Sequence, residues 1–450
     1  MYFKRFIEDD LYAWKANPEH KVAFVRGCRQ VGKTTTIEHF VQSYKNVVKI
    51  NTVLDGEVLE SLLRKHRSNL AGVFSEFCSQ YGIVFTDDND TVIFIDEIQE
   101  NRKVYESIRF LNRELHCDVI VTGSYLEEAL KYFQPAGDTD VFTMYPLSFE
   151  EFLEALNAYR YFKETDFNCI EQARLDWVNE AWHVYCNVGG YPAAVLSFLK
   201  NESVESTLDA IVNTLITEIC DRVESIEERQ MVRDALPAVI DAMLREKKGD
   251  SDLITNISKI TSKYSSYRIS TKECYSIISW LRQAGFLSYC DKVDLGTGAR
   301  YSSERIFFRD LGVLNYLLRT YKVDESDRNG LLAETFVFKI LEERNFFKDF
   351  YYDKPAFAVF EGYELDFSVV SKYDDLVYGI EVKYGNNKGT SIKKALSKRY
   401  VDVAVVLKNS GFGETEDTVT IPLPLAWKFK FNKGKRVDRS LPKLSAFSDT

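Results

Sequence analysis

The stretch that decides the fold is KVAFVRGCRQVGKTTT, residues 21–36. It begins with a short apolar run, Lys21–Arg26, that is typical of a buried strand. It continues as Gly27–Thr34, which matches the phosphate-loop pattern G-x-x-x-x-G-K-[ST] at every fixed position. A helical pattern then covers Thr35–Tyr44. A loop of this pattern is expected between a strand and a helix, and the flanking residues predict that context.

The residue types in this loop suit a nucleotide triphosphate. Glycines permit positive φ, so that backbone N–H groups can curl around phosphate oxygens. Lys33 would place a positive charge on the β and γ phosphates, and the Thr34 hydroxyl would bind Mg²⁺. The following helix presents its positive N-terminal dipole to the same anion. We therefore expect ATP and Mg²⁺ as ligands, with the nucleotide held by Gly27, Cys28, Arg29, Gln30, Val31, Gly32, Lys33, Thr34 and Thr35.

A second, acidic element supports the same site. Residues 91–97, TVIFIDE, form an apolar strand pattern that ends in Asp96 and Glu97. Asp96 is predicted to hold Mg²⁺ through water, and Glu97 to polarise the attacking water. Acids at a strand end are commonly solvated turn residues, and a loop motif alone can match by chance. Together the two elements favour ATP hydrolysis, with Lys33, Asp96 and Glu97 as catalytic residues.

Other residues near this site have more than one interpretation. Ser124 ends the sequence VTGS, residues 121–124, after another strand pattern. It could sense the γ-phosphate as a further catalytic residue, or it could belong to a simple turn. Arg26 and Arg29 flank the loop, and each could contact phosphate, cap a helix or pair with an acid.

The patterns along the chain predict an α/β protein with four regions. Strands and helices alternate through residues 1–150, which predicts the parallel sheet of a P-loop NTPase domain. Residues 151–245 are mostly helical, interrupted by a turn at Gly189–Pro192. Residues 246–325 suggest a winged-helix-like region, because a helix is followed by a two-stranded hairpin. Residues 326–450 alternate again and predict a C-terminal α/β domain.

Net charge, cysteine content and apolar runs indicate which classes of protein and which cellular compartment are expected. The formal net charge of −10 argues against a general nucleic-acid coat but leaves room for a local basic groove. The 8 cysteines include no C-x-x-C pair and do not cluster with histidines, so no zinc site is expected. No signal peptide is visible, and no apolar run reaches the roughly 20 residues that span a bilayer. We expect a cytoplasmic protein with reduced thiols and no membrane partner.

A second group of candidate residues lies near the C-terminus. Glu334 lies in a helix pattern, Asp366 in one strand pattern, and Glu381 and Lys383 in the next. Glu381 and Lys383 would share a strand face, and Glu364 would share that of Asp366 as a spare ligand. Asp366 and Glu381 could hold Mg²⁺ together, while Lys383 steadies phosphate charge. This order is that of PD-(D/E)xK nucleases, although E-x-K on an exposed strand is often just a paired acid and base.

A basic stretch follows these acids and could contact the phosphates of DNA. Its members are Lys388, Lys393, Lys394, Lys398 and Arg399. A solvated helix face would explain the same pattern, so the stretch alone does not identify a partner.

Several motifs together resemble the prokaryotic AAA-type ATPases that carry a C-terminal domain with a restriction-endonuclease-like core. They are GCRQVGKTTT (27–36), FIDEIQ (94–99), VTGSY (121–125), YPLSFEEFL (145–153), GGYPAAV (189–195), FFRDLGVLNYLL (307–318), GLLAETFVFKIL (330–341), GYELDF (362–367) and IEVKYG (380–385). The resemblance implies ATP binding with hydrolysis expected, and it strengthens the case for a nuclease-like site. One departure is Asp138, where the family usually has the arginine of an A-G-R step. If that arginine reads the γ-phosphate or a neighbouring subunit, its replacement affects hydrolysis or assembly.

Three functions remain open at this stage. The first is an ATPase that drives a nuclease-like or DNA-binding C-terminal module. The second is an ATP-dependent switch that binds protein partners and keeps a catalytically inactive nuclease fold. The third is a nucleotide-binding protein with negligible turnover. Each is compatible with an oligomer, because related ATPases often form them.

Overall fold

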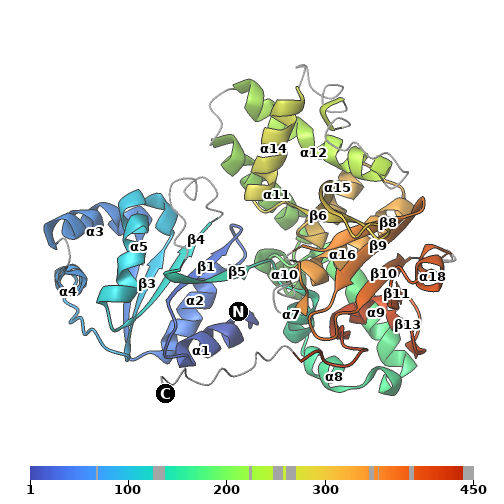
Figure 1. Ribbon diagram of the computed structural model, residues 1–450. Coiled ribbons are helices and arrows are strands. Elements are labelled where there is room, and N and C mark those ends of the chain that lie inside the picture. The colour runs from blue at the N-terminus through green and yellow to red at the C-terminus, as the bar shows by residue number, and fades with distance from the viewer. Residues whose placement is uncertain are drawn as a thin grey trace, which may run out of the picture. The chain divides into compact units, whose positions relative to one another are not determined.

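The structure is a computed structural model (Figure 1). The structure describes residues 1–66, 69–124, 137–221, 226–246, 257–259, 270–343, 349–352, 354–384 and 390–438. The chain divides into two compact units. The first unit comprises Met1–Glu164, Ala181–Ser288 and Phe308–Val323, and the second comprises Thr165–Glu180, Tyr289–Phe307 and Asp324–Thr450.

The first unit contains a five-stranded sheet in which every pairing is parallel, in the order β2-β3-β4-β1-β5. Its strands are β1 Val22–Gly27, β2 Asn46–Asn51, β3 Thr91–Asp96, β4 Asp118–Gly123 and β5 Thr139–Met144. The parallel α/β sheet predicted for residues 1–150 is confirmed. Strand β5 was not predicted, because its partly exposed residues TDVFTM contain no continuous apolar run.

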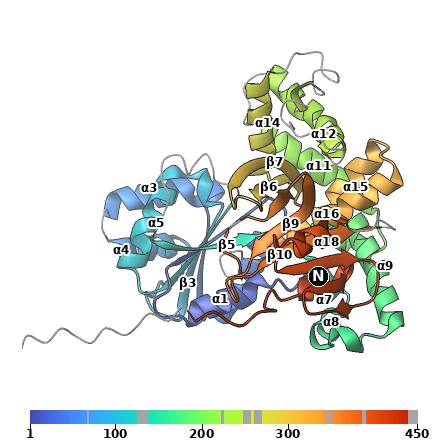
Figure 2. The same cartoon turned by 45° about the vertical axis from the view of Figure 1, so that its right-hand side comes forward.

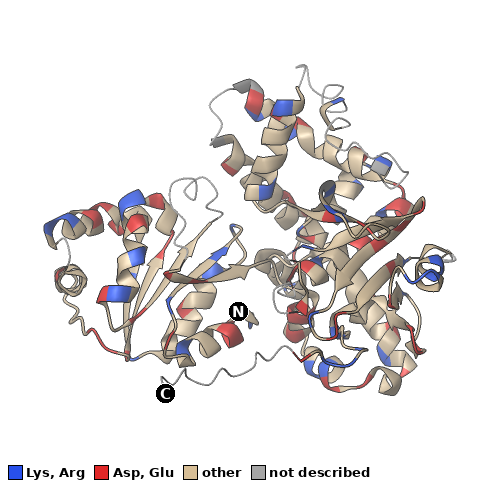
Figure 3. Ribbon diagram, in the orientation of Figure 1, with Lys and Arg blue, Asp and Glu red and all other residues tan. Residues whose placement is uncertain are grey.

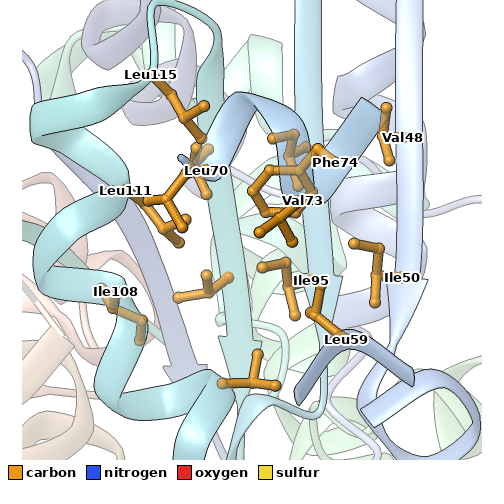
Figure 4. Close-up of a cluster of buried hydrophobic side chains, with 14 of the residues drawn as sticks. Val48, Ile50, Leu59, Leu70, Val73, Phe74, Ile95, Ile108, Leu111 and Leu115 are labelled. Carbon is orange, nitrogen blue, oxygen red and sulfur yellow. The ribbon is translucent and has the colours of Figure 1, made fainter. Parts of the chain in front are cut away.

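Helices cover both faces of this sheet (Figures 1 and 2). They are α1 Ile7–Ala16, α2 Lys33–Phe40, α3 Thr52–His66, α4 Leu70–Gln80 and α5 Arg102–Glu114, with short 3₁₀ turns at Val41–Ser43 and Ile98–Glu100. On one face, Val48 of β2 and Ile95 of β3 belong to a core with Leu59, Phe74 and Leu111 of α3, α4 and α5 (Figure 4). Burial on both faces explains why strands β1 to β4 are so uniformly apolar.

The chain continues mainly as helices. They are α7 Phe149–Ala155, α8 Tyr159–Glu164, α9 Gln172–Val188, α10 Pro192–Leu199, α11 Val204–Asp221, α12 Ile226–Glu246, α14 Thr271–Gln283 and α15 Leu311–Thr320, with a 3₁₀ turn at Phe167–Cys169. The turn predicted at Gly189–Pro192 joins α9 to α10. Gly190 N donates to Asp310 Oδ2 at 2.7 Å, and Leu147 N donates to Gly190 O at 2.6 Å. A Cβ atom on Gly190 would lie 2.1 Å from Leu147 O, so this close backbone approach requires glycine.

The second unit contains a mixed sheet in the order β12-β13-β11-β10-β9-β8-β6-β7. Its strands are β6 Leu287–Asp294, β7 Arg300–Phe308, β8 Ala356–Phe360, β9 Tyr363–Val370, β10 Val377–Lys383, β11 Val403–Lys408, β12 Gly413–Glu414 and β13 Thr418–Pro422. Helix α16, Glu325–Glu343, packs against β10, while α18, Thr390–Ser397, packs against β9, β10 and β11. A 3₁₀ turn, Leu423–Lys428, follows β13.

The hairpin expected within residues 246–325 is present as β6 and β7. Its strand β6 also pairs in parallel with β8, so the hairpin extends the C-terminal sheet. The preceding helix, α14, begins with a capping box formed by Ser270 and Glu273. No helix in the described part of the chain has both the length and the apolar character needed to cross a membrane.

Candidate functional site

The predicted phosphate loop connects the end of β1 to the start of α2. Gly27 is required by close packing, because a Cβ atom there would lie 2.1 Å from Met144 O of β5. The backbone then turns through positive φ at Gln30 (64°) and Gly32 (92°), which Gly32 adopts without steric cost. Helix α2 begins immediately afterwards at Lys33. The chain thus has the curled loop and helix N-terminus that bind phosphate groups.

Lys33 lies inside this loop. Its Nζ donates to Gly27 O at 2.9 Å and to Cys28 O at 2.7 Å, and only 7% of the residue is exposed. Burial lowers the pKa of Lys33, while the charges of nearby acids, Asp96 and Glu97 among them, act in the opposite direction. Two backbone carbonyls and the charges of nearby acids therefore hold the ammonium group against the loop.

Asp96, the last residue of β3, contacts both the phosphate loop and the neighbouring strand β4. Thr34 Oγ1 donates to Asp96 Oδ2 at 2.9 Å, and Thr122 Oγ1, at the end of β4, donates to Asp96 Oδ1. Glu97 N also donates to Asp96 Oδ1 at 3.1 Å. Asp96 is only 4% exposed, so its carboxylate is fixed by these donors. The hydroxyl and carboxylate oxygens of Thr34 and Asp96 are the hard ligands that Mg²⁺ prefers, and the two residues fit such a site.

Glu97 stands at the end of β3 in an unusual backbone conformation, with φ of 52°. Its Oε2 accepts a hydrogen bond from Gln99 Nε2 at 2.5 Å and from Ser124 Oγ at 3.4 Å. A glutamate with positive φ is uncommon, and such strain is often found at functional sites. The sequence analysis included Ser124 but not Gln99. Both side chains orient the carboxylate that was expected to polarise water.

Arg5 is a buried residue of this site that the sequence analysis missed. Its Nη1 donates to Val31 O in the phosphate loop at 2.7 Å, and its Nη2 donates to Tyr145 O at 2.7 Å. Its Nε lies 3.0 Å from Glu151 Oε1, and both side chains are less than 10% exposed. The guanidinium thus links the N-terminal segment, the loop and α7. No local pattern marks Arg5, because its partners lie 26 to 146 residues away.

We predict that Arg5→Met lowers the free energy of unfolding by about 3–5 kcal/mol, because it leaves the buried carboxylate of Glu151 without its charged partner and with only the backbone donors Phe6 N and Ser148 N. Urea denaturation measures this change. Lys4→Met is the matched control: Lys4 is exposed, and its substitution should change stability by less than about 0.5 kcal/mol. A loss below about 1 kcal/mol for Arg5→Met would show that the buried pair does not secure the loop.

Arg26, just before the loop, and Arg29, within it, both pair with other residues. Arg26 Nε donates to Thr143 Oγ1 of β5 at 3.2 Å. Arg29 Nε lies 3.0 Å from Glu218 Oε1 of α11. Asp138 Oδ1 lies 2.8 Å from Arg113 Nη2, whereas Ala136 of the same step lies outside the described residues.

The remaining predicted loop residues differ in burial. Cys28 and Val31 are buried, and Thr35 is exposed in the first turn of α2. The Cys28 thiol donates to Gly285 O at 3.8 Å. The predicted nucleotide-binding residues form one continuous segment between β1 and α2. Asp96 and Glu97 lie at the end of β3, and Ser124 lies at the end of β4.

The second group of acids also comes together, within the second unit. Asp366 Oδ2 accepts a hydrogen bond from Val382 N at 2.6 Å, and Lys383 Nζ donates to Glu381 Oε1. Burial raises the pKa of Asp366 well above its ordinary value, and the nearby charges of Glu334 and Glu381 raise it further. Burial likewise raises the pKa of Glu381. The four predicted residues are thus electrostatic neighbours, contributed by α16, β9 and β10.

A register shift lies at Asp366. Ala358 pairs with Leu365 and Ala356 with Ser368, so β9 has one more residue than β8 between these partners. Such a bulge re-aims side chains and is common beside functional sites. Glu364, proposed as a spare ligand, pairs instead with Arg305, whose Nη2 lies 2.8 Å from Glu364 Oε1.

Whether these acids suit a metal depends on their free oxygens. Glu381 Oε2 is buried and has no hydrogen-bond partner among the described residues, so it is open to a cation. However, the described residues contain no group of three or more His, Cys, Asp or Glu arranged to hold a metal ion. Asp366 and Glu381 fit as a pair, and a metal between them would need further ligands from water or substrate.

The basic stretch lies on and after α18, where lysines gather (Figure 3). Lys394 Nζ lies 3.9 Å from the ring centroid of Tyr363, and Lys398 Nζ pairs with Glu361. Lys393 and Arg399 are exposed, and Lys388 lies outside the described residues. Lys394 and Lys398 therefore already have interaction partners within the second unit.

Comparison with protein families identifies two segments of the chain. Residues 19–153 match the AAA domain family. The AAA-matched segment contains the phosphate loop, Asp96, Glu97 and Ser124, so the match supports nucleotide binding by a P-loop AAA-type domain. Residues 179–324 match a domain of unknown function, DUF8612. No curated protein matches the chain.

Solved structures give only distant likenesses. A Walker-type ATPase of Pyrococcus abyssi is 17% identical, with a TM-score of 0.44, over 70% of this chain and 96% of that one. A RuvB variant of Thermotoga maritima is 14% identical, with a TM-score of 0.27, over 66% and 89%. AMPPCP-bound DnaA of Aquifex aeolicus is 11% identical, with a TM-score of 0.26, over 61% and 86%.

Proposed function

We propose that the chain hydrolyses ATP at the site formed by the phosphate loop, Asp96 and Glu97. The observation that carries this proposal is the 2.9 Å hydrogen bond from Thr34 Oγ1 to Asp96 Oδ2, which joins the loop to the acidic end of β3. The two segments are separated by 62 residues. Their contact, with Glu97 next to it, supports a complete hydrolytic site within the AAA-matched segment.

Each residue has a distinct role in this proposal. Backbone N–H groups of the loop and Lys33 bind the phosphates and stabilise charge that develops on them. Thr34 and Asp96 would hold Mg²⁺, which neutralises charge on the phosphate oxygens. Glu97, oriented by Gln99 and Ser124, accepts a proton from the attacking water. Ser124 could also sense the γ-phosphate directly.

Phosphate release from ATP by the purified protein tests the proposal. Release should require Mg²⁺ and stop when EDTA is added. The same assay with duplex DNA separates the functions left open by the sequence, because stimulation by DNA would favour a nucleic-acid-acting C-terminal module. The absence of phosphate release would contradict the proposal. Thermal stabilisation by ATP without phosphate release would instead favour the nucleotide-binding protein with negligible turnover.

A second candidate function is metal-dependent cleavage of DNA by Glu334, Asp366, Glu381 and Lys383. The observation that favours it is the buried Glu381 Oε2, which has no hydrogen-bond partner among the described residues, in a residue whose charge acts on Asp366. Asp366 and Glu381 would hold a divalent metal, which activates the nucleophile, and Lys383 would steady charge on the phosphate. The alternative is an inactive nuclease fold that binds protein partners, in which Lys383 serves only to neutralise Glu381.

We predict Mg²⁺- or Mn²⁺-dependent cleavage of DNA that falls below detection in Asp366→Ala and in Lys383→Ala. Asp366→Ala should also remove Mn²⁺ binding, measured by calorimetry without DNA, because it removes one of two carboxylate ligands. Glu416→Ala, which alters an exposed acid of the same unit, is the control and should keep both properties. Cleavage that survives both active-site changes would indicate a contaminating nuclease and contradict this assignment.

A further inference from the structure

The phosphate loop contacts residues that lie outside the AAA-matched segment. Arg29 Nε is 3.0 Å from Glu218 Oε1, and Cys28 Sγ is 3.8 Å from Gly285 O. Glu218 and Gly285 both belong to residues 179–324, which match the domain of unknown function, and to the same compact unit as the loop. The loop is therefore tied to a second region, which an AAA domain alone does not explain.

Glu218 adds a negative charge close to the phosphate-binding lysine. It is one of three carboxylates, with Asp96 and Glu97, whose charges act on Lys33. Asp96 and Glu97 have assigned roles at the end of β3, whereas Glu218 comes from α11. Its side chain is only 13% exposed, so solvent screens it less than a surface acid. A carboxylate at this position opposes the binding of an anionic triphosphate.

Arg29 is the cation that this carboxylate engages. Arginine is well suited to bind phosphate oxygens, because its planar guanidinium presents several donors. Arg29 is 43% exposed and lies within the loop, so it is placed to reach a phosphate. Its Nε is instead directed at Glu218. The two groups, carboxylate and phosphate, compete for one guanidinium.

We propose that Glu218 is an affinity-determining residue of the nucleotide site, which restrains Arg29 and lowers the affinity of the loop for triphosphate. This inference rests on the proposed function, since it requires a nucleotide at the loop. It also makes the contact between Arg29 and α11 sensitive to occupancy of the loop. A bound triphosphate draws Arg29 away, and α11 loses a partner in the AAA-matched segment.

Calorimetric titration with AMPPCP and Mg²⁺ tests the proposal on the full chain without turnover. Glu218→Gln keeps the size of the side chain and removes its charge, so the Kd should fall by about three- to fivefold, the scale of one partly exposed charge pair. Glu205→Gln removes an exposed acid from the same helix and should leave the Kd unchanged. The difference between the two variants should shrink at 1 M salt, where the Debye length is about 3 Å.

A gain in affinity cannot result from misfolding, which makes the direction of the effect decisive. Glu218→Ala removes the same charge with a smaller side chain and should shift the Kd in the same direction. Suppose that the wild-type chain binds AMPPCP and that neither Glu218 variant binds it more tightly. The inference about Glu218 is then overturned, while the proposed function stands. If the wild-type chain binds no nucleotide, the proposed function and the inference both fall.

Discussion

Lys33→Ala should weaken nucleotide binding by more than about 100-fold. A hydrogen bond to a charged group contributes about 1.5–3 kcal/mol, and Lys33 is expected to make two with the β and γ phosphates. The summed loss of about 3–6 kcal/mol corresponds to at least two orders of magnitude in Kd. Lys33 Nζ donates to Gly27 O and Cys28 O, so its ammonium group already lies against the backbone of the loop.

Thermal denaturation with and without nucleotide measures this effect. A ligand at 100 times its Kd stabilises the folded chain by about 2.7 kcal/mol, whereas one at its Kd contributes only about 0.4 kcal/mol. Wild-type protein should therefore show a clear rise in Tm with ATP and Mg²⁺, and Lys33→Ala almost none. Lys45→Ala alters an exposed lysine of the same unit and should behave as wild type. An equal rise in Tm for Lys33→Ala and wild type would refute the assignment of this loop as the phosphate site.

The part of the site that could be predicted from sequence is the part that local spacing determines. Gly27 to Thr34 and the Asp96-Glu97 pair each lie in a short motif whose residue types are tied to one chemistry. In a parallel sheet the carboxyl ends of the strands lie at one edge, and this is where ligands bind. A loop after β1 and acids at the end of β3 could therefore be expected to converge, and the structure brings Thr34 and Asp96 together.

Arg5 and Glu218 could not be predicted in the same way. Each is a single charged residue that belongs to no recognisable motif. Arg5 precedes α1, and Glu218 lies in the helical pattern of α11. Arg5 belongs to the site because its guanidinium reaches Val31 O and Glu151, and Glu218 because α11 places it beside Arg29. These contacts depend on how helices pack in three dimensions, and neither periodicity nor motif spacing encodes them.

The C-terminal sheet shows a similar limit. The strand pattern that was expected to contain Glu381 and Lys383 is present as β10, because VYGIEVK is a clear apolar strand pattern. The parallel pairing of β6 with β8 and the bulge at Asp366 were not foreseen. A hairpin and a strand can be recognised locally, whereas the choice of a partner strand far along the chain and a one-residue shift in register cannot.

Glu97→Gln should lower ATP turnover by about 10²–10⁴-fold while nucleotide affinity changes little, because general-base catalysis contributes an effect of that size. The amide keeps the size of the side chain and an oxygen that can accept from Gln99 and Ser124, so the site should keep its geometry. It cannot take a proton from water. Phosphate release at saturating ATP and the rise in Tm with ATP measure the two properties separately.

The neighbouring Glu100 provides a matched control for this variant. Glu100 is exposed, three residues along the chain, and its Oε1 accepts a weaker contact from the same Gln99 at 3.2 Å. Glu100→Gln should therefore retain turnover within about threefold of wild type, since surface substitutions usually have small effects. If Glu97→Gln also retains such turnover, the proton acceptor must be another group. The strained backbone at Glu97 would then serve only to hold Asp96 against Thr34, because its N–H donates to the Asp96 carboxylate at 3.1 Å.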